Sequence, residues 1–343
     1  MRFGVNPNMI VLAREYNGYS QAELAEKIGM SPTNLSKIER SDISINQEVL
    51  SLISDVTRFP VSFFSQEGSI VPENMNYRKR EKVAQKLLTP INARANIVRL
   101  HVQQITRALD TKLTAIPAIE VTESLTPAII AKQVRKLWKL KNPITENVTE
   151  ILENNGIVVS GFNFGTERVD SRCVLTDDKV PVIFYNNSML GDRQRFSLIY
   201  QLGHLIMHTF HQVDWERDVS HEANLFTAEF LMPEADIKDD FSNGVTVPLL
   251  GELKRKWRVS MVALLYRADD LGFISENQKK YLLQKFNELK IRRREPLELD
   301  VPIERPSLIR QCIAELKTQR KFDTKDMAAW LHLSTDEFIQ LYG

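Results

Sequence analysis

The stretch that decides the fold is SQAELAEKIGMSPTNLSKIERS, residues 20–41. Ser20 followed three residues later by Glu23 forms the pattern of a capping box, which predicts that a helix begins after Ser20. Gly29 predicts the end of that helix, and Ser31 is a good N-cap for the next one. The sequence therefore predicts two short helices that meet across a tight turn.

Apolar residues at helical spacing continue on both sides of this stretch, from Pro7 to Phe64. The first helix is predicted from about Pro7 to Tyr16, because Asn17 and Gly18 favour a left-handed helix stop. Four or five helices fit in this region. The pattern is typical of a compact all-helical bundle.

Residues 20–41, with NQEVLSLISDVTRFPVSFF directly after them, resemble the Cro/phage-repressor (XRE-type) helix-turn-helix family. The resemblance implies that the helix from Ser31 to Arg40 lies in the major groove of a double-stranded DNA operator. It also implies a homodimer that binds half-sites about one helical turn apart. The residues implied to contact DNA are Gln21, Ser31, Thr33, Asn34, Lys37 and Arg40. Ser41 stands where the family often has glycine.

The charge distribution along the chain is uneven, although the net charge is only +1. Residues 1–66 carry six Lys/Arg and seven Asp/Glu, whereas residues 77–112 carry nine Lys/Arg and two acidic residues. The second stretch, with a net charge of +7, either attracts DNA phosphates without reading sequence or is a solvated helix face. The sequence leaves both interpretations open.

The length and composition set the class of protein. A chain of 343 residues with 43% hydrophobic residues predicts two or three globular domains. It has no run of about 18 apolar residues and no signal-peptide pattern, so we expect a cytoplasmic protein without a membrane partner. Cys173 and Cys312 form no CxxC pair, and we interpret both as structural.

The middle of the chain changes from helices to strands. A helix is predicted from Thr89-Pro90 to about Leu113, which either connects domains or pairs with a copy of itself. Two more helices are predicted to begin at Thr126 and Pro143. Short strands are then predicted at residues 157–160, 173–176 and 180–185. A small sheet between helices is therefore expected.

Two helical segments follow, GDRQRFSLIYQLGHLIMH at 191–208 and HEANLFTAEFLMP at 221–233. With the strand before them, they resemble the ImmA/IrrE family of zinc-dependent metallopeptidases from about residue 145 to 270. The family signature HExxH places two histidine ligands and a water-activating glutamate on one helix. The residues at these positions are Tyr200-Gln201-Leu202-Gly203-His204, so the first histidine and the glutamate are replaced.

These replacements predict a peptidase-like domain without peptidase activity. Gln201 has no carboxylate to accept a proton from water, and the phenol of Tyr200 is a poor zinc ligand. We therefore predict no catalytic residue and no cofactor, with Tyr200 and Gln201 filling the former metal cavity. An alternative is a zinc site shifted by one helical turn, formed by His204 and His208 with Glu222 or His221 as the third ligand.

The predicted fold class is mainly α with a small β-sheet (α+β): a five-helix repressor-type head, a zincin-like (ImmA/IrrE-type) domain and a helical C-terminal extension. Residues 295–306 are expected to form an extended linker, followed by two or three short helices that pack or form a dimer contact. The predicted domains are residues 1–68 (helix-turn-helix), 69–142 (basic helical connector), 143–290 (peptidase-like) and 291–343 (linker and C-terminal helices).

Three functions fit this organisation. The leading hypothesis is a transcriptional regulator whose inactive peptidase-like domain is a sensor or scaffold, with a peptide, small molecule or protein bound in the old cleft. The first alternative is a zinc metallopeptidase that cleaves a repressor or partner protein. The second is a protein-interaction module of the anti-repressor or antitoxin type.

Overall fold

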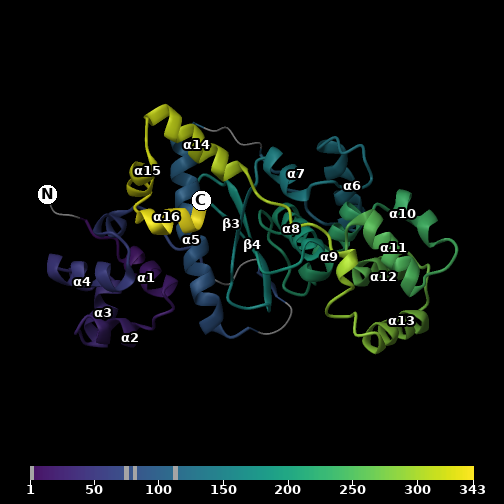
Figure 1. Ribbon diagram of the computed structural model, residues 1–343, viewed down its shortest axis with the longest axis horizontal. Coiled ribbons are helices and arrows are strands. Elements are labelled where there is room, and N and C mark those ends of the chain that lie inside the picture. The colour runs from purple at the N-terminus through teal and green to yellow at the C-terminus, as the bar shows by residue number, and fades with distance from the viewer. Residues whose placement is uncertain (1–3, 73–76, 80–82, 111–114) are drawn as a thin grey trace.

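The structure, a computed structural model, describes residues 4–72, 77–79, 83–110 and 115–343. It confirms a mainly helical chain with one small sheet. Figure 1 shows the N-terminal helices at one end, the sheet in the middle and a larger group of helices at the other end. The predicted domain boundaries stay a prediction.

The N-terminal head is the predicted bundle. Its helices are α1 (Pro7–Tyr16), α2 (Gln21–Lys27), α3 (Pro32–Glu39) and α4 (Gln47–Thr57), and a 3-10 turn, η1 (Val61–Ser65), takes the place of the fifth helix. Both halves of the predicted capping box are present, between Ser20 and Glu23. Ser41 has a φ of 65°, so a serine adopts the left-handed conformation that glycine adopts without strain.

The next helix, α5 (Gln85–Ala108), lies in the interior of the molecule. It begins at Gln85, four residues before the predicted start at Thr89, so Pro90 lies inside the helix, where it removes one backbone hydrogen bond. It packs against α1, against the C-terminal helix α14 (Leu308–Arg320) and against the sheet. Pairing of its apolar stripe with a second copy is therefore wrong, since that stripe is buried within the chain.

The sheet has four strands in the order β1-β3-β4-β2. Its strands are β1 (Tyr77–Lys79), β2 (Val158–Phe162), β3 (Val169–Leu175) and β4 (Pro181–Asn186). β2 pairs with β4 in parallel, whereas β3 pairs with β4 and with β1 in antiparallel. The three later strands were predicted, but β1 was not.

A second hydrophobic core, separate from the one that contains the head, is formed by one face of the sheet and by the helices between α5 and the C-terminal α14. They are α6 (Pro127–Leu137), α7 (Val148–Asn154), α8 (Gly191–Met207), α9 (Val219–Leu231), α10 (Glu234–Phe241), α11 (Val247–Trp257), α12 (Met261–Asp270) and α13 (Glu276–Glu288). α8 carries the degenerate signature and packs against α9, β3 and β4. The site is thus enclosed between the sheet and α9.

The C-terminal segment returns to the head. After η2 (Leu297–Leu299), it forms α14, α15 (Thr324–Trp330) and α16 (Thr335–Tyr342), which lie beside α5 and α1 in Figure 1. The expected linker is irregular but anchored, because Glu304 forms an ion pair with the buried Arg195 and the Ser307 amide donates to Glu153. It is therefore a packed connection rather than a free linker.

Of the two interpretations of the basic stretch, the solvated helix face is wrong for Arg99 on α5 but fits Arg107, and attraction of DNA phosphates stays a prediction. Arg99 is fully buried and donates to Asp177 (3.0 Å). Arg107 is exposed but forms an ion pair with Asp178 (2.6 Å). Arg94 lies over the ring of Phe162, 4.9 Å from its centroid. Arg94 and Arg99 thus make contacts within the molecule, and the basic residues at 80, 82 and 112 lie outside the described residues.

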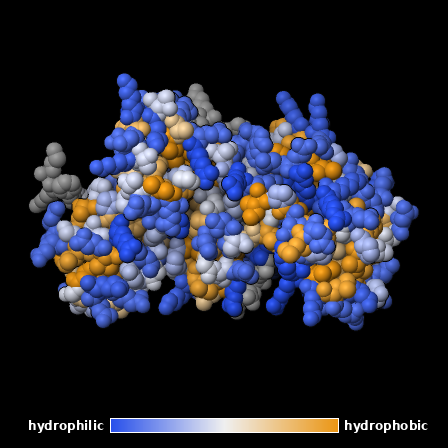
Figure 2. All heavy atoms as spheres, in the orientation of Figure 1, coloured by the Kyte–Doolittle hydropathy of each residue, from blue (hydrophilic) through white to orange (hydrophobic). Residues whose placement is uncertain are grey.

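The visible surface mixes hydrophilic and hydrophobic residues, with separate hydrophobic patches such as the one over α12 and α13 (Figure 2). Exposed apolar side chains next to these two helices in the sequence include Phe273 and Leu289. Among the described residues, no helix is both long and apolar enough to cross a membrane.

Candidate DNA-reading helix and peptidase-like site

The outer face of α3 consists of the predicted DNA-contacting residues. Leu35 and Ile38 turn inward and are buried, which leaves the opposite side of the helix in solvent. The Ser31 hydroxyl accepts a hydrogen bond from the backbone amide of Asn34 (3.3 Å) and caps the helix. The predicted residues that are exposed are Ser31, Thr33, Asn34, Lys37 and Arg40.

Gln21 differs from the other predicted residues because its side chain is already bound within the head. Its amide donates to Glu39 at 2.7 Å, and the same carboxylate accepts from Arg14 at 2.6 Å. This fixes the start of α2 against the end of α3. The sequence analysis missed Arg14 and Glu39, since nothing in their spacing shows that they meet.

In the peptidase-like module, Gln201 lies in the interior. Its side chain is fully buried, and its amide nitrogen donates to the Ser171 hydroxyl on β3 at 3.0 Å. Its amide oxygen has no hydrogen-bond partner in the part of the chain that the structure describes. The position that would activate water in an intact signature therefore holds a neutral amide tied to the sheet.

Arg78 on β1 covers the same region. It donates to the Ser197 hydroxyl at 2.6 Å, and its guanidinium lies 4.7 Å from the ring centroid of Phe196 and 5.1 Å from that of Tyr200. In the β1–β3 register it is the partner of Ser171, the residue that binds Gln201. No sequence signal pointed to this contact, because it joins positions more than one hundred residues apart.

Further along α8, two histidines and a glutamate form a hydrogen-bonded chain. Nδ1 of His204 and Nδ1 of His208 are 2.9 Å apart, and Nε2 of His208 is 2.8 Å from Oε2 of Glu222. Arg217, from the loop before α9, donates to both carboxylate oxygens of Glu222, at 2.9 and 2.6 Å. The structure thus brings the three predicted metal ligands together, with an arginine that was not foreseen.

Burial and hydrogen bonding set the ionisation of this chain. Burial lowers the pKa of His204 to about 3, and burial is also the main cause of the lowered pKa of His208. Burial raises the pKa of Glu222, but hydrogen bonds from Arg217 and His208 outweigh it and the net pKa is lowered. Burial raises the pKa of Tyr200. Both histidines are therefore neutral at pH 7, while Glu222 is charged and paired.

These donors do not fit a zinc ion as they are arranged. A tetrahedral site needs several lone pairs directed at one point, but Nδ1 of His204 and Nδ1 of His208 face each other. Nε2 of His208 faces Glu222, whose two oxygens also accept from Arg217. The phenol of Tyr200 would have to lose a proton that burial holds in place. Among the described residues, no group of three or more His, Cys, Asp or Glu side chains is placed to hold a metal. We therefore assign no chemistry to a metal here.

The head and module define the class: a helix-turn-helix protein joined to a peptidase-like module with a degenerate signature. Comparison with known families agrees, since a helix-turn-helix family matches residues 10–64 and the IrrE N-terminal-like domain family matches residues 152–269. The chain therefore carries an XRE-type helix-turn-helix domain fused to an IrrE N-terminal-like domain. A search of curated proteins found no match.

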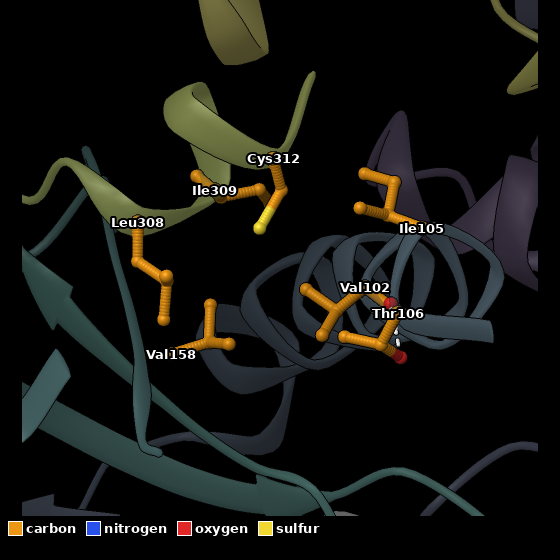
Figure 3. A pocket seen from close by; sticks show the side chains of 7 residues that line it. All are labelled: Val102, Ile105, Thr106, Val158, Leu308, Ile309 and Cys312. Carbon is orange, nitrogen blue, oxygen red and sulfur yellow. Dashed lines mark hydrogen bonds between the residues drawn. The ribbon is translucent and has the colours of Figure 1, made fainter. Parts of the chain in front are cut away.

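A separate cavity lies between α5, β2 and α14 (Figure 3). It is lined by the apolar side chains of Val102, Ile105, Val158 and Leu308 and by the sulfur of Cys312. Its volume of about 10 Å³ is that of at most one water molecule. It is a small packing gap at the joint between the C-terminal segment and α5 rather than a ligand site.

Proposed function

We propose that this protein is a DNA-binding transcriptional regulator whose peptidase-like module is a sensor or interaction scaffold rather than a peptidase. The observation that carries the proposal is the buried Gln201 amide, bound to Ser171 where the signature requires a carboxylate. It stands in the same chain as an α3 whose reading face is exposed. The reader is complete, while the hydrolytic centre lacks its base.

The head reads DNA through α3. Asn34 offers an amide that can pair with an adenine edge, and Lys37 offers a cation for a guanine edge or a phosphate. Thr33 supplies a methyl group and a hydroxyl for neighbouring base edges. The head alone carries a net charge of −1, so affinity depends on the local placement of Lys37 and Arg40 and on a homodimer that engages two half-sites.

The module lacks what peptide hydrolysis requires. A zinc peptidase needs a metal-bound water and a carboxylate that removes its proton, and the Gln201 amide cannot act as that base. Arg217 neutralises Glu222, the remaining carboxylate of the signature region. The hydrogen-bond network instead stabilises one arrangement of α8, α9 and β3.

A sensing role follows from the position of β1. This strand belongs to the segment between the head and α5, and its Arg78 lies on Tyr200 at the former active site. A peptide, small molecule or partner protein that binds at Tyr200 would contact Arg78 as well. If such a ligand bound more tightly when β1 was in one of two positions, it would shift β1 toward that position and change the contacts that position the head.

The DNA-reading part can be tested by selecting binding sites for the full chain from a pool of randomised duplexes. Lys37→Ala should weaken the selected site by about 1–3 kcal/mol and relax the base preference at one position. Lys27→Ala is the matched control, because Lys27 is an exposed lysine on α2 outside the reading face. Equal losses for the two variants, or a pool without enrichment, would contradict sequence-specific reading.

A further inference from the structure

The last three helices repeat the helix-turn-helix of the head. α2 and α15 each contain seven residues and each begin with a capping box. α3 and α16 each contain eight residues and follow a serine N-cap. Every C-terminal position lies 303 residues after its counterpart. The paired positions are Ser20 and Asp323, Glu23 and Asp326, Gly29 and His332, and Ser31 and Ser334.

The backbone of the turn is the same in both copies. Gly29 has a φ of 67° and His332 a φ of 56°, so the second copy adopts the left-handed conformation without a glycine. The amide-to-carbonyl hydrogen bonds coincide as well. Matching bonds are Tyr19 to Arg14 (3.1 Å) with Phe322 to Lys317 (3.0 Å), Met30 to Ala25 (2.8 Å) with Leu333 to Ala328 (2.9 Å), and Leu35 to Ser31 (3.2 Å) with Phe338 to Ser334 (3.0 Å).

Four apolar positions are buried in both copies, so the inner faces of the two units correspond, although Ile38 is buried and its counterpart Leu341 only partly buried. The buried pairs are Leu24 and Met327, Ala25 and Ala328, Ile28 and Leu331, and Leu35 and Phe338. A shared inner face, shared caps and a shared turn define the same supersecondary unit.

The outer face of the second unit does not suit DNA. The counterparts of Thr33, Asn34 and Lys37 are Asp336, Glu337 and Gln340. α16 contains no lysine or arginine, and its two carboxylates would face the phosphates that Lys37 attracts in the head. The helix that reads DNA in the first unit is therefore acidic in the second.

α16 instead contacts the head of its own chain. The Tyr16 hydroxyl at the end of α1 donates a hydrogen bond to the half-buried Glu337. The Tyr342 hydroxyl lies 2.8 Å from Nδ1 of the buried His101 on α5. Both contacts come from the third helix of the second unit, so this helix closes the head against α5.

The second unit is also tied to the peptidase-like module. Backbone amides of Ser307 and Leu308, at the start of α14, donate to Glu153 on α7. Three residues earlier, Glu304 forms an ion pair with Arg195 on α8, the helix that carries the degenerate signature. The unit thus has one attachment to the head and one to the module.

We infer that residues 307–343 are a second helix-turn-helix unit that does not read DNA, and that its third helix docks on the N-terminal head of the same chain. The unit is a physical link between α8 and the head. The docking of this helix does not depend on the proposed function. Only the statement that the N-terminal head reads DNA rests on the proposed function.

Amide hydrogen exchange of the full chain tests the docking. Glu337→Ala should raise exchange rates in α1 about tenfold, the effect of losing a hydrogen bond to a carboxylate. Gln340→Ala is the matched control, because Gln340 is exposed on the same helix, and it should leave α1 unchanged. Unchanged exchange of α1 in Glu337→Ala would overturn the docking.

Two further measurements complete the test. If Glu337→Ala unfolds α16, Tyr16→Phe decides, because it removes only the donor and should speed exchange in α16; no change there would overturn the docking. In DNA titrations of the full chain, Lys37→Ala should weaken binding and Gln340→Ala should not. An equal loss for Gln340→Ala would overturn the inference that the second unit does not read DNA. Exchange of α1 is independent of DNA, so failure of the docking and failure of the proposed function are distinguishable.

Discussion

Truncation of Glu304 to alanine should strongly destabilise the protein. Glu304 accepts from Arg195, whose side chain is 1% exposed and also donates to the carbonyls of Thr145 and Glu146. Without Glu304, the guanidinium stays buried with no carboxylate partner among the contacts of the described chain. Removing one partner of a buried ion pair costs about 3–5 kcal/mol. We expect a loss of that size in the free energy of unfolding.

Urea unfolding followed by circular dichroism measures this loss. The matched control is Asp300→Ala, in the same segment, which removes an ion pair with Arg294 whose side chains are 41% and 39% exposed. An exposed pair contributes about 0–1 kcal/mol, so the control should stay near the parent. If Glu304→Ala lost no more free energy than Asp300→Ala, the 300–308 segment would not be anchored as described, and the link from α8 to the second helix-turn-helix unit would fail.

Two more predictions concern packing and pH. A Cβ on Gly191 would lie 2.3 Å from the Val301 carbonyl oxygen, so Gly191→Ala should lower the free energy of unfolding by about 1–3 kcal/mol in denaturant titrations. The control is Gly251→Ala inside α11, which should be neutral or slightly stabilising. Equal effects of the two substitutions would contradict this packing. Burial lowers the pKa of His101 to about 3 from an ordinary 6.5, so the neutral ring favours folding above pH 6.5 and that stability is lost as the pH falls. Between pH 7 and 5 the loss is about 2 kcal/mol, and a His101→Phe variant with the same pH profile as the parent would contradict it.

The head could be predicted from the sequence because its signals are local. The caps at Ser20 and Ser31 each act on a residue three positions further on, the turn glycine acts on its own backbone, and the predicted α1 has the observed bounds. The strands β2, β3 and β4 were found from their β-branched and aromatic residues. Local sequence signals determine these helices and strands, so tertiary packing changes their bounds only slightly.

The missed features all depend on long-range contacts. β1 is a strand because Tyr77–Lys79 pairs with β3. Its own three residues carry no strand pattern in the sequence. The arginines of α5 look like a basic surface in the sequence, yet Arg99 is buried against Asp177. Pro90 suggested a helix start, but the helix extends one turn further.

The second helix-turn-helix unit was missed for another reason. Its turn carries His332 in place of glycine and its first cap is Asp323 in place of serine, so the family pattern is hidden while the geometry is kept. The sequence predicts short helices that pack or form a dimer contact. In the structure α14 packs against α5 and β2, and α16 forms a hydrogen bond to the head. A dimer contact stays a prediction.

The candidate site was predicted residue by residue but not as a network. The positions of Tyr200, Gln201, His204, His208 and Glu222 followed from the signature. The contacts that close the site come from Arg78 and Arg217, which lie in other elements. Sequence spacing places residues on one helix face, but it does not show which arginine side chain from another element contacts them.

We propose that the peptidase-like module has exchanged metal chemistry for a closed hydrogen-bond network. The most direct test is the zinc content per chain, by elemental analysis, of protein purified without chelators or metal-affinity columns, in the parent and in His204→Ala. We expect well below one zinc per chain, with the same value in both proteins. About one zinc per chain in the parent, lost in His204→Ala, would contradict it and establish a shifted site at His204, His208 and Glu222.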